Sequence, residues 1–465
     1  MDQYQYRFVY QYYASRCHFG YFHKGDILPP IKQLCDKFQV SRQTIRNAFA
    51  QLQQDGYLSV SAGRRTTVVY DASEEKIEND IKAYYLARKA VMLDLNRTTM
   101  LLLAPMFEEG CRLLSAEDLQ RFGRIAALPD TEVSYLSLVC CFTMLGKLQN
   151  PLAVDLANEI VLYFQFPCLQ KAIDSYAEER EYSRKAIDRI AACCHQNDRQ
   201  GLLEVYLQLQ DQYYRAMKDY ILPPQTDKTA VVQIPFHWQG YYGRPQYCYS
   251  LVLRLMRRVE EGICKEGALL PSFSAMAEEY GVSFSTVRRA VDLSNSLGIT
   301  KSINGVGTQI AFSAPDTEKL RQPAILRNFD ILFYSIQMIT LSCDKVIGAA
   351  FSAISQSKRN AILDDLRHSV QSGKPHRLLY VSIHHLLDVY PLASIREICE
   401  RLYEYLFWGY PFIRTQQWDK AAQRASIMLV EGLQKNDALL YSQGIQTLLA
   451  EMSGIVKHAL KRPGI

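Results

Sequence analysis

The chain has 465 residues, of which 48% are hydrophobic and 22% charged, and this composition excludes a disordered chain. One hydrophobic core rarely serves such a length, so we expect several domains. The formal net charge is +5, and residues 1–70 alone hold nine Lys and Arg against four Asp and Glu, which accounts for all of it. Charge gathered in one segment suits a polyanionic partner, although it fits a solvated face about as well.

The first residues, MDQYQYRFVY, lack a basic start followed by an apolar run. Apolar stretches such as SYLSLVCCFTML stop short of a membrane span, so we expect a cytoplasmic protein that does not enter the membrane. The twelve Cys are scattered or vicinal, with no CxxC pair, and we interpret them as reduced residues of the core.

Residues 31–54 have the pattern of two short helices joined by a tight turn. In the first, IKQLCDKF, apolar residues recur at helical spacing, and Ser41 is a favoured N-cap for the second. The buried stripe of the second helix is predicted to be Ile45, Ala48, Phe49 and Leu52. Its outward face then carries Arg42, Gln43, Arg46 and Asn47. These features predict a helix-turn-helix.

After Gly56, the segment LSVSAGRRTTVV alternates apolar and polar residues around Ala62-Gly63, which is typical of a β-hairpin. Arg64 and Arg65 lie at its predicted tip. A hairpin that follows a helix-turn-helix is a wing, so residues 1–71 are expected to form a winged-helix domain.

A helix of this kind fits the major groove of B-DNA, where its N-terminal residues reach base edges. Arginine suits guanine O6 and N7, and glutamine suits adenine. The predicted base readers are Arg42, Gln43 and Arg46. The predicted phosphate anchors are Lys32, Ser41 and Thr44. The wing residues expected to contact DNA are Arg64 and Arg65.

The stretch GDILPPIKQLCDKFQVSRQTIRNAFAQLQQDGYLSV, followed by GRRTTV, resembles the winged-helix DNA-binding domain of the GntR family of bacterial transcription regulators. The resemblance covers about sixty residues and includes the recognition helix and the wing. It implies that DNA is contacted by Lys32, Arg42, Thr44, Arg46 and Arg64. Winged folds also serve as protein-interaction modules, and against that alternative the basic excess favours DNA.

The chain repeats itself. Residues 25–68 align on 267–310 without a gap and share eleven identities in 44 positions. NPLAVDLANEI at 150–160 resembles YPLASIREICE at 390–400, so the whole unit is interpreted as duplicated. The expected domains are winged helix 1–71, helical 72–222, linker 223–245, winged helix 246–312 and helical 313–465. The fold class is therefore mainly α, and the aromatic residues of the linker suggest that it packs against something.

The second winged helix keeps part of the predicted DNA surface, namely Ser283, Ser285, Thr286, Arg288 and Arg289. Phe284 replaces Arg42, Ser274 replaces Lys32 and Val306 replaces Arg64. Residues 246–312 hold seven basic against six acidic residues, so much of the counterion-release driving force is gone. Either this copy reads a different half-site, with Phe284 against a thymine methyl, or it has a structural role.

The helical regions resemble the ligand-sensing C-terminal domain of the FadR branch of the GntR family, through the N-P-L helix start and a last long helix after N-D. Many members hold a metal through an aspartate and three histidines. At those places this chain has Ser137, Cys141, Ser183 and Leu209, and in the second copy Arg377 and Val381 at the first two. We expect no metal site, because these residues cannot supply such a shell.

His384 and His385, as helix neighbours, point about 100 degrees apart and are interpreted as packing or surface residues. Several aromatic residues could line an effector pocket or simply form core or interface, namely Tyr163, Phe164, Phe166, Phe407, Trp408 and Tyr410.

The sequence predicts a DNA-binding transcription regulator with a possible small-molecule effector and no cofactor. It is not expected to be an enzyme, because it has no phosphate loop, nucleophile motif or metal cluster. Two copies in one chain could act as an intramolecular pseudo-dimer on an asymmetric operator, and a homodimer is the other arrangement considered. The alternative function is a protein-interaction scaffold whose winged helices, the second above all, no longer bind DNA.

Overall fold

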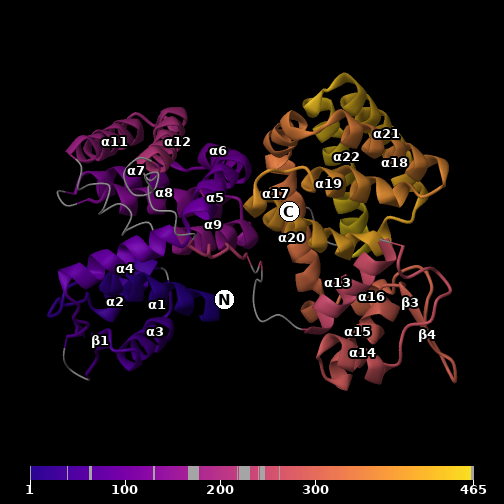
Figure 1. The fold of residues 1–465 in the computed structure, drawn as a ribbon, viewed down its shortest axis with the longest axis horizontal. Coiled ribbons are helices and arrows are strands. Elements are labelled where there is room, and N and C mark those ends of the chain that lie inside the picture. Colours follow the sequence, from indigo (N-terminus) through magenta and orange to yellow (C-terminus); the bar gives the residue numbers. More distant parts are fainter. Residues whose placement is uncertain are drawn as a thin grey trace. The chain divides into compact units, whose positions relative to one another are not determined.

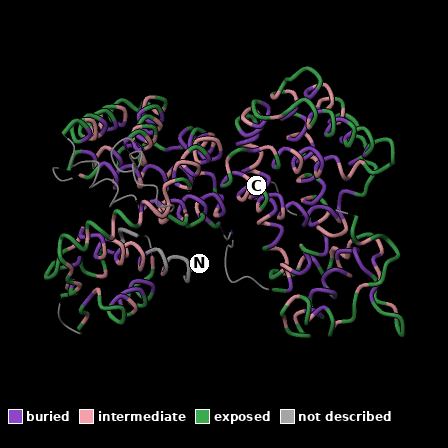
Figure 2. The backbone as a smooth tube through the Cα atoms, viewed as in Figure 1, coloured by how far each residue is buried: buried purple, intermediate pink, exposed green. Residues whose placement is uncertain are grey.

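The computed structural model describes residues 2–38, 40–61, 65–128, 131–165, 177–216, 218, 231–238, 240, 247–260 and 262–461. The chain divides into two compact units, Met1–Gln239 and Gly240–Ile465. Each unit joins a small winged-helix domain to a larger helical module (Figure 1). Buried residues follow the inward faces of the helices in both units, whereas exposed residues cover their outer faces (Figure 2).

Winged domain 1 has the predicted helix-turn-helix and wing, preceded by a long first helix. Its elements are α1 (Asp2–His18), α2 (Ile31–Phe38), α3 (Arg42–Gln54), β1 (Leu58–Ser59) and β2 (Thr67–Val68). The strands pair antiparallel, and an isolated bridge adds Ile27 to Thr67. The predicted stripe of α3 is confirmed, since Ile45, Ala48, Phe49 and Leu52 are all buried.

Helical module 1 consists of α4 (Glu74–Leu86), α5 (Lys89–Leu102), α6 (Ala104–Arg112), α7 (Ala116–Ala126), α8 (Val133–Lys147), α9 (Pro151–Phe164), α11 (Ala177–His195) and α12 (Arg199–Ala216). Residues 231–238, in the expected linker, pack against this module. The Trp238 indole is 1% exposed and donates to Asp155 Oδ2 over 2.8 Å, while the Tyr163 hydroxyl donates to the Ile234 carbonyl over 2.6 Å. This part of the linker is therefore anchored, as its aromatic residues suggested.

Winged domain 2 repeats the first element by element. It consists of α13 (Tyr247–Glu260), α14 (Phe273–Tyr280), α15 (Phe284–Ser296), β3 (Thr300–Ile303) and β4 (Gly307–Ile310). A bridge between Leu269 and Gln309 corresponds to the one between Ile27 and Thr67. The turn glycines Gly20 and Gly262, 242 positions apart, both have positive φ, 70° and 77°.

Helical module 2 consists of α16 (Thr317–Leu320), α17 (Pro323–Ala353), α18 (Gln356–Gln371), η2 (Pro375–Arg377), α19 (Leu378–Leu387), α20 (Ala393–Leu406), η3 (Phe407–Phe412), α21 (Gln416–Lys435) and α22 (Ala438–Ala459). Among the described residues, α17 alone is long and apolar enough to cross a membrane, which the sequence reading did not anticipate. Half of its most apolar window is buried inside the protein, and it packs against α20 and α22. Its apolar length is thus accounted for by a central place in the bundle.

The duplication extends to the turn before the last helix of each module. Asn197 and Asn436 both adopt the left-handed conformation, with φ of 55°, which asparagine tolerates better than most residues. In each copy the following aspartate accepts a backbone hydrogen bond from the helix that begins there, Asp198 from Gly201 and Asp437 from Leu440. A left-handed Asn followed by a capping Asp thus starts the last helix twice.

Candidate nucleic-acid interface

The outward face of α3 carries the three predicted base readers. Arg42, Gln43 and Arg46 are all exposed, as the helical spacing predicted. Gln43 donates to the Asn47 side chain over 2.7 Å. Neither Arg42 nor Arg46 has a hydrogen bond or an ion pair within the described part of the chain, so both guanidinium groups are available to bases or phosphates.

The start of α3 is held by two hydroxyl groups. Ser41 Oγ accepts from the Thr44 backbone N–H over 3.1 Å and lies 2.8 Å from Thr44 Oγ1. Ser41 is exposed, whereas Thr44 is only 3% exposed. In this conformation Thr44 is turned inward and its hydroxyl lies against the capping Ser41, so its predicted phosphate contact would need a local rearrangement. Ser41 itself is open to a phosphate.

Lys32 on α2 and Arg65 at the wing are exposed, and neither has an ion pair among the residues described. Arg64 lies outside the described residues, so its predicted place at the wing tip stays a prediction. In winged domain 1, the predicted contacts that the structure describes thus come from α2, the first half of α3 and the wing.

The corresponding face of winged domain 2 is chemically different. Ser283 Oγ accepts from the Thr286 N–H over 3.2 Å and lies 2.9 Å from Ser285 Oγ, which repeats the cap of α3 and adds a hydroxyl. Phe284 is 53% exposed, and its ring centroid lies 5.6 Å from that of Phe273. This domain therefore presents hydroxyls and an aromatic ring where the first presents a guanidinium.

The remaining basic residues of this face are Arg288 and Arg289, both exposed. Arg288, which corresponds to Arg46, has no ion pair among the described residues, whereas Arg289 interacts with the region of Cys248 and Tyr249. Val306, at the wing position of Arg64, is 60% exposed. With Phe284, Ser274 and Val306 in place of three basic residues, the attraction to a polyanion is weaker here.

The last residue of the first helix also differs between the two domains. His18 ends α1 and lies 3.4 Å from Asp80 on α4. The residue 242 positions later is Glu260, which is 7% exposed, and one of its carboxylate oxygens has no hydrogen-bond partner among the described residues. Burial raises the pKa of Glu260 to about 7, although the positive charges of Arg414 and Arg377 act in the opposite direction.

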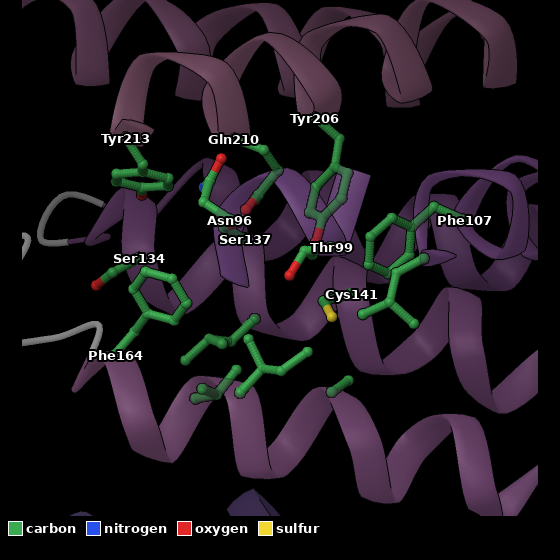
Figure 3. A pocket seen from close by; sticks show the side chains of 15 residues that line it. Asn96, Thr99, Phe107, Ser134, Ser137, Cys141, Phe164, Tyr206, Gln210 and Tyr213 are labelled. Atoms are coloured by element: carbon green, nitrogen blue, oxygen red, sulfur yellow. Dashed lines mark hydrogen bonds between the residues drawn. The ribbon is translucent and has the colours of Figure 1, made fainter. Parts of the chain in front are cut away.

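A small cavity lies inside helical module 1, between α5, α6, α8, α9 and α12 (Figure 3). Its interior volume is about 40 Å³. Polar groups that line it include Asn96, Thr99, Ser134, Ser137 and Gln210. Burial raises the pKa of Cys141 to about 12, and that of Tyr206 well above its ordinary value, so the thiol and the phenol that line the cavity are neutral. The lining therefore offers neutral hydrogen-bonding groups on an apolar wall.

Ser137 and Cys141, two of the four residues at which the resemblance would place metal ligands, line this cavity. Leu209 is buried on α12 and Ser183 lies on α11. Across the described ranges, no group of three or more His, Cys, Asp and Glu is placed to hold a metal ion.

In unit 2, Arg377 ends η2, Val381 is buried in α19, and the two histidines of α19 contact different partners. His385 lies 2.9 Å from Asp365, whereas His384 stacks on Tyr380. The two rings also lie edge to face, with centroids 6.1 Å apart.

The aromatic candidates separate into different environments. Phe164 lines the cavity, and Tyr163 packs on Phe236 of the anchored segment. Phe407, Trp408 and Tyr410 belong to the buried interior of unit 2. Phe166 lies outside the described residues.

Sequence reasoning did not single out most of the cavity residues. A signal was present in α8, where Ser134, Ser137 and Cys141 recur at spacings of three and four in an otherwise apolar helix. Asn96, Thr99 and Gln210 give no comparable signal, because the first two lie on α5 and the third on α12, and they meet only when these helices pack.

The family model described as "Bacterial regulatory proteins, gntR family" matches the chain twice, at residues 5–68 and 250–310. No curated protein matches the chain. Solved structures that are similar include a Streptococcus agalactiae GntR, with 16% identity, 44% of this chain and 99% of that chain covered, and a TM-score of 0.21. E. coli McbR/YncC has 16% identity, coverage of 47% and 98%, and a TM-score of 0.25. A putative transcriptional regulator GntR from Rhodococcus sp. RHA1 has 14% identity, coverage of 45% and 99%, and a TM-score of 0.23.

Proposed function

We propose that this chain, a GntR-family DNA-binding transcription regulator with a duplicated winged-helix domain, reads DNA sequence mainly through α3 of winged domain 1. The observation that carries the proposal is that Arg42 and Arg46, on the N-terminal half of that helix, are exposed and have no ion-pair partner among the residues that the structure describes. Paired arginines on a free helix face suit guanine edges in the major groove. A protein-interaction scaffold has no need of them, nor of the excess positive charge of the domain.

Selection of bound sequences from random duplexes tests the proposal, with the full chain as the bait. A preferred sequence should emerge, and binding to it should weaken linearly as the logarithm of salt concentration rises. Lys82→Ala is a matched control for charge, because it removes one cation from α4, outside the winged domain. A chain that enriches no sequence at low ionic strength would refute the proposal.

Lys32→Ala separates positioning from reading. Because a phosphate contact carries no sequence information, this change should weaken all duplexes alike and reduce the salt slope by about one unit. Arg42→Ala should instead act mainly on the preferred sequence. Equal, sequence-blind losses in both variants would contradict the division of roles.

The second part of the proposal is that one chain acts as a pseudo-dimer, with its two winged domains on two half-sites. Two copies in one chain supply what relatives obtain by pairing two chains. Because α3 and α15 differ at their exposed positions, the operator should be asymmetric. Light scattering of the complex with the selected duplex should give one chain per operator, and a two-chain complex would contradict the pseudo-dimer.

The third part is that the cavity of helical module 1 accepts a small uncharged effector. Among the described residues that line it there is no carboxylate, histidine, lysine or arginine to balance a charge. A volume of about 40 Å³ has room for roughly three water molecules, at the ~10–15 Å³ that each requires. A larger ligand would therefore have to move the helices apart. A ligand that binds this opened conformation more tightly than the closed one shifts the chain toward it, which can couple effector binding to DNA release.

Ser137→Phe tests the effector site, because Ser137 is buried on α8 and a phenyl ring would fill the cavity. Neutral metabolites would be screened for those that change the affinity of the full chain for its selected duplex. The expected result is loss of that change in Ser137→Phe, with DNA binding retained. A metabolite that acts equally on both proteins must bind elsewhere.

A further inference from the structure

The position that corresponds to Arg42 in winged domain 2 holds an exposed aromatic ring. Phe284 is the first residue of α15, directly after the N-cap Ser283, and Arg42 has the same place after Ser41. A side chain at this point of a recognition helix faces base edges when the helix lies in the major groove. Phe284 is 53% exposed, although burying its ring in the domain would have been favourable.

The ring does not lie loose on the surface. Its centroid is 5.6 Å from that of Phe273, the first residue of α14, with the ring planes inclined by 59°. Phe273 is itself half-buried, so it supports Phe284 from the neighbouring helix. Contact with Phe273 therefore restricts the orientation of the exposed ring.

The surroundings of Phe284 match a nucleic-acid backbone better than an apolar protein surface. Ser283 and Ser285 are exposed hydroxyls beside it, and the exposed Arg288 lies one turn further along α15. Leu269 is also exposed, but so is the corresponding Ile27 of winged domain 1, and both side chains are 54% exposed. An exposed apolar residue at this position is therefore common to both domains. Hydroxyl and guanidinium groups are the usual phosphate partners.

Within the major groove, the apolar group displayed by a base edge is the C5-methyl group of thymine, and phenylalanine is among the side chains that contact it. We propose that Phe284, supported by Phe273, reads a thymine methyl group in the half-site of winged domain 2. The inference rests on the proposed DNA-binding function and deepens it. The operator then has a half-site read by arginine and a half-site read by an aromatic ring.

Uracil differs from thymine only in lacking this methyl group, so it provides the test. Each thymine of the selected duplex is replaced by uracil in turn, and the affinity of the full chain is measured by fluorescence anisotropy at fixed salt. At one thymine, or at two neighbouring ones, the affinity should fall by about 3- to 5-fold, the effect of one buried methyl group. Elsewhere the replacement should have little effect.

Phe284→Ala should abolish the sensitivity to uracil at that position, and Phe284→Leu should keep part of it because leucine still offers an apolar contact. Arg42→Ala is the matched control: it should weaken binding overall while leaving the ratio between thymine and uracil unchanged. Because Phe284 is exposed, neither Phe284→Ala nor Phe284→Leu removes a core residue.

In one outcome the chain binds the duplex, but no thymine shows a loss on replacement by uracil that depends on Phe284. That result would overturn the inference and leave the proposed function intact. If Phe284→Ala changes the mass of the free chain in light scattering while its DNA affinity is unchanged, the face is a protein interface and the inference is wrong. Failure of the chain to bind any duplex would overturn the proposed function and this inference together.

Discussion

Winged domains 1 and 2 share the contacts that stabilise their backbone fold but differ in the residues on their surfaces. In both, a serine caps the second helix of the helix-turn-helix and lies 2.8 Å from a threonine hydroxyl three residues later. Both close with one extra bridge before the wing, Ile27 to Thr67 and Leu269 to Gln309. The residues that set backbone geometry have thus stayed alike between the copies.

The surfaces of the two domains have diverged most where DNA would be read. The first 70 residues carry a net charge of +5, and residues 246–312 carry +1. The exchange of Arg42 for Phe284 leaves the cap in place, because an N1 side chain takes no part in it. A duplicated frame can therefore present two different recognition surfaces without refolding.

The contact between the winged domain and its helical module also differs. His18 faces Asp80 in unit 1, whereas Glu260, at the matching position, faces the positive charges of Arg377 and Arg414 in unit 2. An imidazole in one copy is thus replaced by a buried carboxyl group in the other. The two junctions therefore differ in their chemistry.

The largest expected effect tests whether the two frames are independent. Phe49 is 2% exposed in α3, and its ring packs edge-on against Tyr13 at 5.4 Å. Phe49→Ala should destabilise winged domain 1 by about 3–5 kcal/mol, through lost burial and the cavity left behind. Hydrogen exchange of the full chain should show faster exchange in α3 and unchanged exchange in α15.

Asn47→Ala, on the exposed face of the same helix, is the control and should change exchange by less than about 0.5 kcal/mol. Faster exchange in α15 after Phe49→Ala would show that the two winged domains unfold as one, and the comparison of separate frames would fail.

The next effect is a dependence of stability on pH that comes from Glu260 in unit 2. The pKa of Glu260 is about 7 in the folded chain, above its ordinary value of 4.5. The folded state therefore holds the proton more tightly, so this stabilisation is complete below pH 4.5 and is lost as pH rises to 7 and above. Glu260→Gln should have little effect at pH 5 and should stabilise the chain at pH 8, by on the order of 3 kcal/mol.

Thermal unfolding of both proteins at each pH gives the difference between them. His376, whose pKa is lowered to about 4 by burial and then by Arg414, Arg377 and Lys374, opposes this trend in the acidic range, but it is present in both proteins. His18→Gln is the matched variant in unit 1, where the loss of a half-exposed pair should be worth about 1 kcal/mol or less. Destabilisation by Glu260→Gln at pH 8 would mean that the carboxylate is ionised and held by the arginines.

The sequence predicted those parts of the fold and the site that depend on neighbours along the chain. The stripe of α3 and its cap at Ser41 follow from helical spacing and from the preference of serine for N-caps. The burial of Glu260 and the hydrogen bond from Trp238 to Asp155 depend on residues tens of positions away. Thr44 shows the limit within one helix, because it was predicted to anchor a phosphate and the folded domain buries it.

A smaller effect is expected from substitutions at the position where the two recognition helices differ most. Arg42→Ala should lower affinity for the selected duplex by about 1–3 kcal/mol, the range for a bidentate contact with a base pair. Phe284→Arg should make the salt dependence steeper by up to about 0.9 in slope, since one more cation meets a phosphate or a guanine. A repeated selection with Phe284→Arg should enrich guanine at the position otherwise held by thymine, and an unchanged selected sequence would mean that α15 does not read DNA.

The smallest effect separates the cap from the DNA contact. Ser41→Ala and Ser283→Ala should each destabilise their own domain by about 1 kcal/mol, since each removes the acceptor for a backbone N–H of the first turn. Aspartate caps as well as serine, so Ser41→Asp should keep the stability while placing a negative charge against the phosphates. Ser283→Asp should lower DNA affinity in the same way if α15 also lies on the duplex. A loss confined to Ser41→Asp would mean that winged domain 2 stays off the DNA, and the two copies would then share a fold without sharing a role.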